Sequence, residues 1–490
     1  MSIRGIKGGI LKFMSEDDLY AIHIATLEVL SEVGIEMEYK PALEIFKDHG
    51  AKVDFKNKRV KIDEWLLNKG LSSVPSTFTL HGKNEEFDVN IDPERVYTMG
   101  GAGAINILDL DGNYRLAYYD DVIKLTILLD HMENLHIMQG TVMPSDLEEN
   151  GVDRMNFAGV FPFTRRNYYS QARTGADCVR EHIKMAAVVQ GSEDEVRKKP
   201  MFTEGVCFVS PLKHGAVNSE IVMECAKNNI PVYIEVDAMP GGTTPAPIAG
   251  TLVEQNANVL SGILLGQLVN PGAPCIYATA SGLMDMSKGS FSAGAPETDL
   301  IHCATAQLAH YYKLPYQGGA GIDTKIPDAQ GGYESALQVL SNLLAGTNIL
   351  ISYGMIEMML TVSYEQIVID NEIIGASFRI LKGFEVNDST LSVDFLKKIG
   401  LKGGHFLDLK ETSQYVRHNN WRPKLTNRET WKNWKIGGGK DMRVRANELA
   451  RKILSENTEP VILKDQYEEI QKMASSYYKA AVEKYRSNSM

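Results

Sequence analysis

Short apolar runs alternate with helix-length segments from about residue 100 to residue 353. The runs expected to be strands are 104–108, 135–138, 168–171, 205–209, 232–236, 275–279, 314–317 and 349–353. Helices are expected between most of them, at 176–190, 218–228, 251–269, 296–312 and 328–345. Eight strands alternating with helices predict a (β/α)8 barrel, with an open doubly wound sheet as the alternative.

Regions on both sides of this repeating pattern have different signals. Ser15 and Asp18 have capping-box spacing before a helical apolar pattern that ends at Gly34. We therefore expect an N-terminal cap of helical and mixed structure at residues 1–90 and a catalytic barrel at 91–385. The strand pattern is lost after about residue 385, which predicts a mainly helical extension at 386–490 that packs on the barrel.

Composition narrows the class of protein. The 490 residues carry a net charge of −11, which disfavours a nucleic-acid partner because such proteins need a basic face. Five dispersed cysteines predict a reducing, cytoplasmic setting without disulfides. The charge-free stretch 255–284 contains Asn256, Asn258 and Pro271, so we expect a buried helix and strand there and no membrane segment.

Barrel enzymes carry their active site at the carboxyl ends of the strands. Aromatic residues near these ends predict a cage for a cation that donates no hydrogen bonds, although each ring taken singly is more typical of a core. The rings are Tyr97, Phe163, Tyr169, Phe202, Tyr277, Tyr316 and Tyr353. Polar candidates near the same ends are Gln171, Arg173, Glu204, Glu235 and Gln317.

Other kinds of catalytic site lack their usual sequence signals. No pair of His or Cys residues has zinc-ligand spacing, and no G-x-S-x-G or P-loop motif occurs. The loop "MPGGTTPAPIAG" at 239–250 offers backbone and no charged side chain. It is either a tight strand-to-helix turn or a rim against which a large flat group settles.

Several long blocks resemble the trimethylamine methyltransferase superfamily. They are "IHIATLEVLSEVGIEM", "GGTTPAPIAGTLVEQNANVLSGILLGQLVNPGAPCIYA", "DTKIPDAQGGYESAL" and "GGHFLDLKETSQYVRHNNWRPKL". The resemblance implies a (β/α)8 barrel that passes a methyl group from an amine to the cobalt of a corrinoid on a separate small protein. It also implies a homo-oligomer.

The resemblance has one departure that bears on the substrate. Founding members carry pyrrolysine in the segment that looks equivalent to 323–333, whereas this chain has only ordinary residues there, Gln330 among them. Members without pyrrolysine resemble demethylases of quaternary amines. Glycine betaine is the expected substrate, with proline betaine, carnitine or γ-butyrobetaine as alternatives.

Roles for individual residues follow from the resemblance. We expect Glu204 and Gln330 to act in catalysis and Arg173, or backbone amides, to hold a betaine carboxylate. Glu204 or Glu235 would complement the ammonium, with a buried glutamate paired with a structural arginine as the alternative. The remaining substrate-binding residues expected are Tyr97, Phe163, Tyr169, Gln171, Tyr277, Tyr316, Gln317 and Tyr353, and the corrin ring of cob(I)alamin is expected against Gly241, Gly242, Thr243 and Thr244.

Three other functions remain as alternatives. A non-catalytic betaine-binding barrel would bind ligand without transferring methyl. A zinc-dependent methyltransferase of the same fold would contain stoichiometric metal, whereas we expect no metal held by this chain. An enzyme for trimethylamine itself is disfavoured by the ordinary residues at 323–333.

Overall fold

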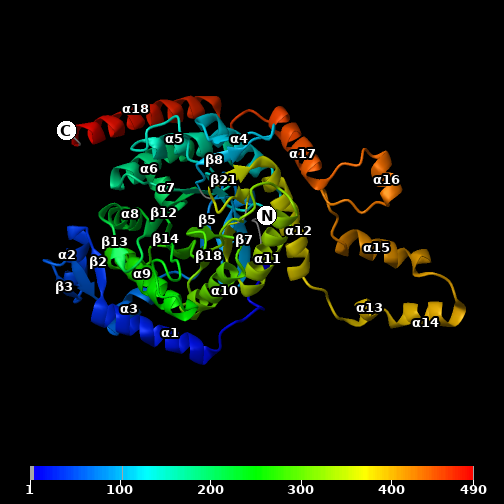
Figure 1. Cartoon of the computed structure of the whole chain (residues 1–490), viewed down its shortest axis with the longest axis horizontal. Helices are drawn as coiled ribbons and strands as arrows, with labels where there is room; N and C mark the ends of the chain where they lie inside the picture. Colours follow the sequence, from blue (N-terminus) through cyan, green and yellow to red (C-terminus); the bar gives the residue numbers. More distant parts are fainter. Residues whose placement is uncertain (1–4, 102, 352, 489–490) are drawn as a thin grey trace.

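A curled sheet of nine strands with helices around its outside forms the body of the protein (Figure 1). The computed structural model describes residues 5–101, 103–351 and 353–488. The sheet order is β1-β7-β19-β18-β15-β14-β12-β11-β10, and only β1 is antiparallel to its neighbour among these described strands. Their bounds are β1 Ile6–Lys7, β7 Arg95–Met99, β10 Met138–Gln139, β11 Tyr168–Ser170, β12 Phe202–Phe208, β14 Val232–Val236, β15 Cys275–Thr279, β18 Tyr316–Gly318 and β19 Ile349–Ile351.

The two ends of the run of parallel strands lie next to each other. Met99 of β7 forms a parallel bridge with Ile137, the residue before β10. The Ile137 amide donates to the Thr98 carbonyl at 3.1 Å, and the Gly100 amide donates to the Ile137 carbonyl at 3.2 Å. The sheet therefore curls far enough for β7 to approach the far edge strand.

Side chains alternate between an inner and an outer face of the curled sheet. The inner face carries a cluster that includes Tyr97, Tyr169, Tyr233, Ile276 and Ile349. The hairpin of β5 (Phe78–Leu80) and β6 (Val89–Ile91) packs into the same cluster, and the Tyr97 hydroxyl donates to the Asn90 carbonyl at 2.6 Å. This hairpin fills the interior near the amino ends of the strands, so the hollow left for a ligand lies at the carboxyl ends.

Helices cover the outer face. They are α4 Tyr119–Asp130, α5 Val152–Val160, α6 Ala176–Gln190, α7 Glu193–Lys198, α8 Ala216–Lys227, α9 Ile248–Val269, α10 Pro296–Tyr311, α11 Ala329–Ala345 and α12 Tyr364–Leu381. The expected helices at 176–190, 218–228, 251–269, 296–312 and 328–345 are confirmed as α6, α8, α9, α10 and α11, with small shifts at their ends.

Helix α9 accounts for the charge-free stretch. The helices α1 (Glu16–Glu28), α2 (Lys40–Asp48), α3 (Glu64–Leu71) and α8 all pack on α9, so it is covered on nearly every side. A Cβ at Gly262 would collide with the ring of Phe208, which explains why a glycine allows this close approach. Of the described helices, none combines the length and hydropathy needed to cross a bilayer.

The first expected strand was misplaced. The run 104–108 contains β8 (Asn106–Leu108), but β8 pairs with β9 (Tyr114–Leu116) and β21 (Thr361–Ser363) in a separate sheet that also holds β20 (Met355–Ile356). The first parallel strand of the main sheet is β7 instead. It begins with Arg95 and is less apolar than 104–108, yet its Tyr97 and Met99 point into the buried interior.

The N-terminal region confirms the predicted helix start. Ser15 and Asp18 form a reciprocal capping box, and α1 continues through a π-helical turn, Val29–Val33, to Gly34 at φ 75°. The strands β2 (Ile35–Met37), β3 (Lys52–Asp54) and β4 (Arg59–Lys61) form a small sheet with β13 (Lys213–His214). This sheet joins the N-terminal region to the side of the body.

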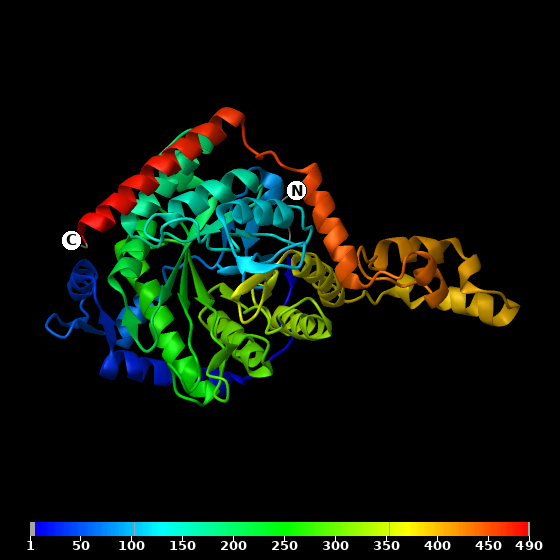
Figure 2. The ribbon, with the colours of Figure 1, turned by 45° about the horizontal axis from the view of Figure 1, so that its top comes forward.

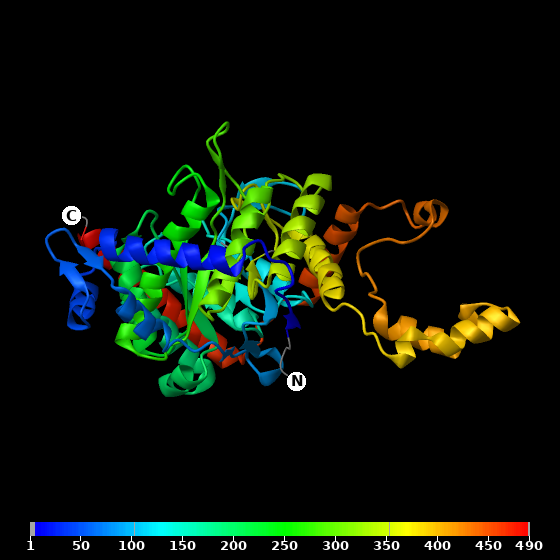
Figure 3. The ribbon, with the colours of Figure 1, turned by 90° about the horizontal axis from the view of Figure 1, so that it is seen from below.

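The C-terminal region only partly packs on the body as expected. Helix α17 (Met442–Glu456) packs on α12, and α18 (Lys464–Asn488) runs along α5 and α6 (Figure 2). Between α12 and α17, four short helices project away from the body (Figures 1 and 3). They are α13 Asp388–Leu391, α14 Val393–Lys402, α15 Lys410–Asn419 and α16 Trp431–Ile436.

Candidate functional site

A hollow of about 400 Å³ opens at the carboxyl ends of the parallel strands. Its walls come from β11, β12, β14 and β15, and from the loop that carries Met359. Parallel strands end at the same edge of a sheet, so residues distant in sequence meet there. The lining residues are Gly103, Gln171, Ala172, Arg173, Gly205, Cys207, Asn218, Ile221, Glu235, Asp237, Ala280 and Met359.

One wall of the hollow is acidic. Cys207 of β12 lies opposite Glu235 of β14 in the parallel register, and Asp237 follows on the same face. The thiol and the two carboxylates each place an atom within 4.8 Å of the others. Burial raises the pKa of Glu235 well above its usual value, the Asp237 charge raises it further, and no cation among the described residues opposes this. A bound cation would supply the missing charge.

The Cys207 thiol is not set up as a nucleophile. Burial raises its pKa well above the usual value, and the charges of Asp237 and Glu235 add to this effect. A thiol becomes reactive when a positive neighbour stabilises its thiolate, and here the neighbours are acidic. Cys207 therefore stays protonated and contributes bulk and polarizability to the wall.

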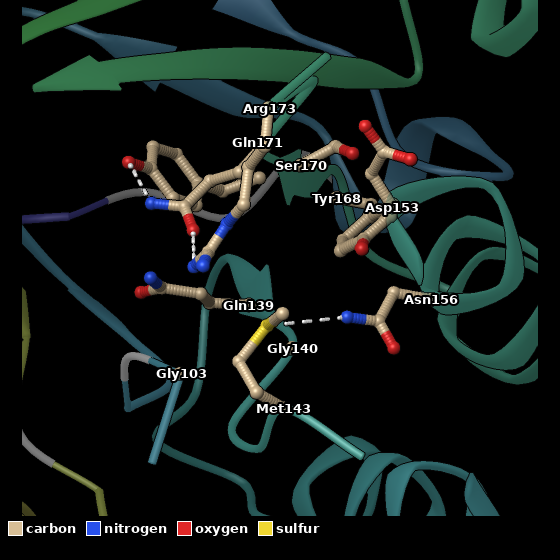
Figure 4. A pocket seen from close by; sticks show the side chains of 11 residues that line it. Gly103, Gln139, Gly140, Met143, Asp153, Asn156, Tyr168, Ser170, Gln171 and Arg173 are labelled. Atoms are coloured by element: carbon tan, nitrogen blue, oxygen red, sulfur yellow. Dashed lines mark hydrogen bonds between the residues drawn. The ribbon is translucent and has the colours of Figure 1, made fainter. Parts of the chain in front are cut away.

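A second wall of the hollow carries Arg173 and Gln171, which together with Gln139 also line a narrower hollow next to it (Figure 4). The Arg173 guanidinium donates to Gln171 Oε1 at 2.7 Å, and Gln171 Nε2 donates to the Tyr169 hydroxyl at 3.4 Å. Gln139 lies beside them, and its buried Oε1 accepts no hydrogen bond from the described residues. The hollow thus holds a guanidinium and two carboxyl groups that form no ion pair with one another among these residues.

Gln317 lies on the inner face one strand beyond β15. It pairs in register with Ala278, which itself pairs with Glu235, so the three residues are at one level of the sheet. Gln317 is fully buried, yet neither its amide oxygen nor its amide nitrogen finds a hydrogen-bond partner among the described residues. An unpaired buried amide costs about 1–3 kcal/mol. A polar group on a ligand would relieve that cost.

Two of the expected aromatic residues point into the interior. Tyr169 lines the narrower hollow next to Arg173 and packs edge-on against Tyr233 with ring centroids 4.7 Å apart. Tyr97 is also on the inner face, but it lies near the amino ends of the strands against the β5–β6 hairpin. Of these two tyrosines, only Tyr169 lines a hollow at the carboxyl ends of the strands.

The other rings expected in a cage are not brought to the hollow. The Tyr316 hydroxyl is within hydrogen-bond distance of Thr279 and of His302 on α10, so this side chain faces outward. Tyr353 donates to Asn371 of α12 at 3.5 Å, and Phe163 packs edge-on against Tyr467 of α18. Tyr277 and Phe202 belong to the outer core cluster. Successive residues of a strand face opposite sides of the sheet, and Tyr277, Tyr316 and Phe202 occupy positions on the outer face, so their rings pack in the outer core.

Glu204 likewise faces outward, away from the hollow. Its carboxylate accepts from His182 Nδ1 at 2.7 Å and from the Ala172 amide at 2.9 Å, and it is fully buried between β12 and α6. Glu204 and Cys207 are three residues apart, so they occupy opposite faces of the strand. The glutamate fits the alternative interpretation of a buried structural carboxylate, although its partner is a histidine and not an arginine.

Gln330 sits in the first turn of α11 and is exposed. Its side chain donates to Glu334 Oε1 at 2.8 Å, and its backbone amide donates to Asp328 Oδ1 at 2.9 Å. Asp323 in the same segment accepts from Ser292 and Ala293, at the end of the hairpin β16 (Leu283–Asp285) and β17 (Ser290–Ser292). Gln330 is therefore exposed on α11 and is not among the residues that line the hollow.

The loop that follows β14 is compact and offers its backbone. Gly241 has φ 78°, and its amide donates to the Thr244 carbonyl at 3.0 Å. Gly241 and Gly242 are exposed, while Thr244 is buried and shares a hydrogen bond with Thr251 of α9. A Cβ at Gly242 would lie 3.1 Å from the Met284 sulfur of the β16–β17 hairpin. The loop is therefore a tight turn that exposes its backbone at Gly241 and Gly242.

Several residues that line the two hollows were not among the predicted site residues, and Cys207, Asp237 and Gln139 are three of them. Asp237 and Gln139 stand directly at strand ends, and Cys207 shares the inner face with Gly205. A strict count of alternate positions along β12 and β14 identifies Cys207, Glu235 and Asp237 together and rejects Glu204. Counting alternate strand positions was therefore the signal in the sequence that could identify these residues, because no chemical motif marks them.

Comparison with known proteins gives strong matches over most of the chain. The family described as trimethylamine methyltransferase (MTTB) matches residues 3–477. Trimethylamine methyltransferase MttB of Desulfitobacterium hafniense (strain DSM 10664 / DCB-2) is 36% identical over 455 residues, which covers 92% of this chain and 91% of the relative. Glycine betaine methyltransferase of Desulfitobacterium hafniense (strain Y51) is 35% identical over 424 residues, covering 86% and 88%.

A solved structure also resembles the chain. The monomethylamine methyltransferase (MtmB) of Methanosarcina barkeri is 14% identical, with a TM-score of 0.48, and the match covers 92% of this chain and 95% of that one.

Proposed function

The chain belongs to the trimethylamine methyltransferase family, and we propose that it transfers a methyl group from a betaine to the cobalt of a corrinoid protein. The observation that carries the substrate class is the separation of charge in the hollow. Glu235 and Asp237 lie in the same hollow as Arg173 without pairing with it. A zwitterion with an ammonium and a carboxylate complements both walls at once.

Glycine betaine is the substrate we propose, because one relative with 35% identity is named glycine betaine methyltransferase. Proline betaine, carnitine and γ-butyrobetaine have the same two charged groups at other separations. Trimethylamine offers no carboxylate for Arg173. The relatives named for trimethylamine make it the necessary comparison in any assay.

The chain's own residues would bind and orient the substrate. The Glu235 and Asp237 carboxylates neutralise the ammonium, and Arg173 donates to the carboxylate while Gln171 holds the guanidinium in place. Tyr169 offers one ring to the methylated nitrogen. Partial burial excludes water and strengthens these interactions, so positioning supplies much of the rate enhancement.

A docked corrinoid would supply an electron pair on reduced cobalt for the bond to the methyl carbon. The C–N bond then breaks, its electrons remain on nitrogen, and a neutral tertiary amine leaves. Because the quaternary nitrogen is already fully charged, no proton is needed. The open hollow and the exposed backbone of the Gly241–Gly242 turn leave room for a broad planar group. Glu204 and Gln330, proposed earlier for catalysis, would act only through the packing around the site.

We also propose that the main sheet is a (β/α)8 barrel, with residues 91–385 as the catalytic domain. The Met99–Ile137 bridge and its neighbouring backbone hydrogen bonds support this proposal, because they join β7 to the strand at the other end of the parallel run.

The decisive experiment is a spectral assay with reduced corrinoid protein and a panel of quaternary amines. The expected result is loss of the reduced-corrinoid absorbance with glycine betaine, stoichiometric with the tertiary amine formed, and no change with trimethylamine. Binding of betaine without any transfer would favour a non-catalytic binding protein.

A second candidate follows from Cys207, Glu235 and Asp237, whose atoms are close enough to ligate one metal ion. A zinc-dependent methyltransferase would require stoichiometric metal at these three residues. Elemental analysis of the purified chain, repeated on Cys207→Ser, separates the two functions. The absence of metal from both the native chain and the Cys207→Ser variant would support binding of the substrate ammonium by Glu235 and Asp237.

A further inference from the structure

The loop between β20 and β21 has an unusual backbone. Glu357, Met358 and Met359 have φ values of 52°, 54° and 69°, so three consecutive residues other than glycine lie in the left-handed region. Hairpin loops of this length are usually built around a type I turn, in which φ is negative at both central positions. Positive φ favours glycine, asparagine or aspartate, because the Cβ of other residues comes too close to the following carbonyl oxygen. The residue types of this loop therefore do not account for its conformation.

Hydrogen bonds from the body hold the loop in this conformation. The Glu357 amide donates to the Thr324 carbonyl at 2.8 Å, and the Met358 amide donates to the Ile322 carbonyl at 3.0 Å. The Glu357 carboxylate accepts from the Thr361 hydroxyl at 2.5 Å. The loop is therefore fixed at the same time to the segment that follows β18 and to the first residue of β21.

The two methionines of the loop have different surroundings. Met359 lines the hollow that also contains Glu235 and Asp237. The Met358 sulfur instead lies 3.8 Å from Lys325 Nζ, and Met358 is not among the residues that line the hollow. Strained residues persist only where their surroundings fix them, and they are concentrated at functional sites. What this strained loop brings to the site is the side chain of Met359.

Met359 bounds the hollow on a side that has no other described side chain. Most of the lining residues belong to the region from β11 to β15 and to α8. The strands β7 and β19 pair with each other, and the lining residues that follow them in sequence are Gly103 and Met359. A glycine leaves space and a methionine fills it. The length of the Met359 side chain therefore sets the extent of the hollow on the side of β7 and β19.

A methionine side chain suits contact with a methylated cation. A quaternary ammonium has no N–H to donate, so its methyl groups need apolar, polarizable neighbours, and the methionine thioether is both. Tyr169 is the one ring of the expected cage that lines a hollow here, so ring surface alone does not surround such a group. We propose that Met359 is a specificity-determining residue that limits the size of the groups on the bound nitrogen. This inference rests on the proposed function, because it takes the ligand to be a betaine.

Isothermal titration with glycine betaine and with N-ethyl-N,N-dimethylglycine, which is one methylene larger, tests the proposal. We expect the native chain to bind glycine betaine about tenfold more tightly than the larger compound, which is typical discrimination for one methylene. Met359→Ala should reduce this ratio to about one, whereas Met359→Leu keeps the bulk and should keep the ratio within about threefold of native. The matched control is Met358→Ala, which changes the same residue type in the same loop and should leave the native ratio.

Two results would overturn the role of Met359. One is the same affinity ratio in the native chain and in Met359→Ala, and the other is an equal change in Met358→Ala, which would make the loop a structural element only. A methyl-transfer assay on the same preparations separates this inference from the proposed function. Binding without transfer by the native chain would contradict the proposed function, while the affinity ratios would still decide the role of Met359. A native chain that binds neither compound would overturn both.

Discussion

Cys207 and Glu235 lie directly opposite each other on β12 and β14, and Asp237 continues the same inner face two residues later. This relationship puts two carboxyl groups side by side, and neither forms an ion pair with a cation among the described residues. The energetic consequence is that Glu235 resists ionisation until a positive charge arrives, which links its charge state to ligand binding.

Glu235→Gln removes one of these charges without changing the size of the side chain. We expect the affinity for glycine betaine to fall about 10- to 100-fold, since a charged contact contributes roughly 1.5–3 kcal/mol. Isothermal titration with glycine betaine measures the change. The control is Glu297→Gln on the exposed first turn of α10. Equal affinity in the native and Glu235→Gln proteins would exclude the acidic wall as the ammonium site.

Glu204→Gln should act on stability and not on catalysis. The carboxylate accepts from His182 and from the Ala172 amide inside the body, so its loss should lower the free energy of unfolding by about 1–3 kcal/mol. We expect kcat to stay within about threefold of native. Urea unfolding and the corrinoid assay, performed on the same preparation, give both values. A loss of kcat with unchanged stability would restore Glu204 as a catalytic residue.

Gly242→Leu should obstruct docking of the corrinoid protein. A Cβ at this position would already lie 3.1 Å from the Met284 sulfur, so a leucine side chain would crowd the exposed turn and the β16–β17 hairpin beside it. We expect KM for the corrinoid protein to rise about tenfold, which corresponds to roughly 1.4 kcal/mol, with betaine affinity unchanged. Gly215→Leu, at a glycine with open space and φ −64°, is the control. Reduced betaine affinity would instead place the turn inside the substrate site.

Asp299→Asn should remove a pH dependence of stability. Burial raises the pKa of Asp299 from 3.8 to about 7, and its Oδ1 has no hydrogen-bond partner among the described residues. The folded state therefore binds an extra proton between these values, so native stability falls as pH rises from about 4 to 7 and is level above that. At about 1.4 kcal/mol per pKa unit, the stability of the variant relative to the native protein should be a few kcal/mol higher at pH 8 than at pH 4.

Urea unfolding of native and Asp299→Asn proteins at pH 4 and pH 8 measures this difference. The control is Asp285→Asn in the β16–β17 hairpin, where neighbouring Ser287 lowers the pKa of the exposed carboxylate. Parallel pH profiles for native and Asp299→Asn proteins would show that Asp299 ionises normally in the fold.

The sequence predicts the regular elements better than the site. Helix α6 follows from helical periodicity, because burial along one side is encoded locally, whereas α9 follows from an apolar stretch of helical length. The first parallel strand is β7 and not the run 104–108, because β7 pairs with a segment that is distant in the sequence. No local pattern around Arg95 records that pairing.

Side-chain direction accounts for the mixed outcome at the site. Arg173, Gln171 and Glu235 reach the hollow, whereas Tyr316 and Glu204, also near strand ends, face the helices. An error of one residue in the phase of a strand exchanges its inner and outer faces. Proximity to a strand end was therefore insufficient, and alternation had to be counted from a residue already known to be buried inside.

The unsatisfied amide of Gln317 has an evolutionary consequence. Selection for heat resistance alone would favour an apolar replacement at this position, because methionine fills similar space without a polar group to desolvate. If the amide binds the substrate, a lineage that keeps glutamine there exchanges melting temperature in the empty state for ligand recognition. Melting temperature should consequently rise when the right compound is added, which makes thermal-shift screening a direct way to find it.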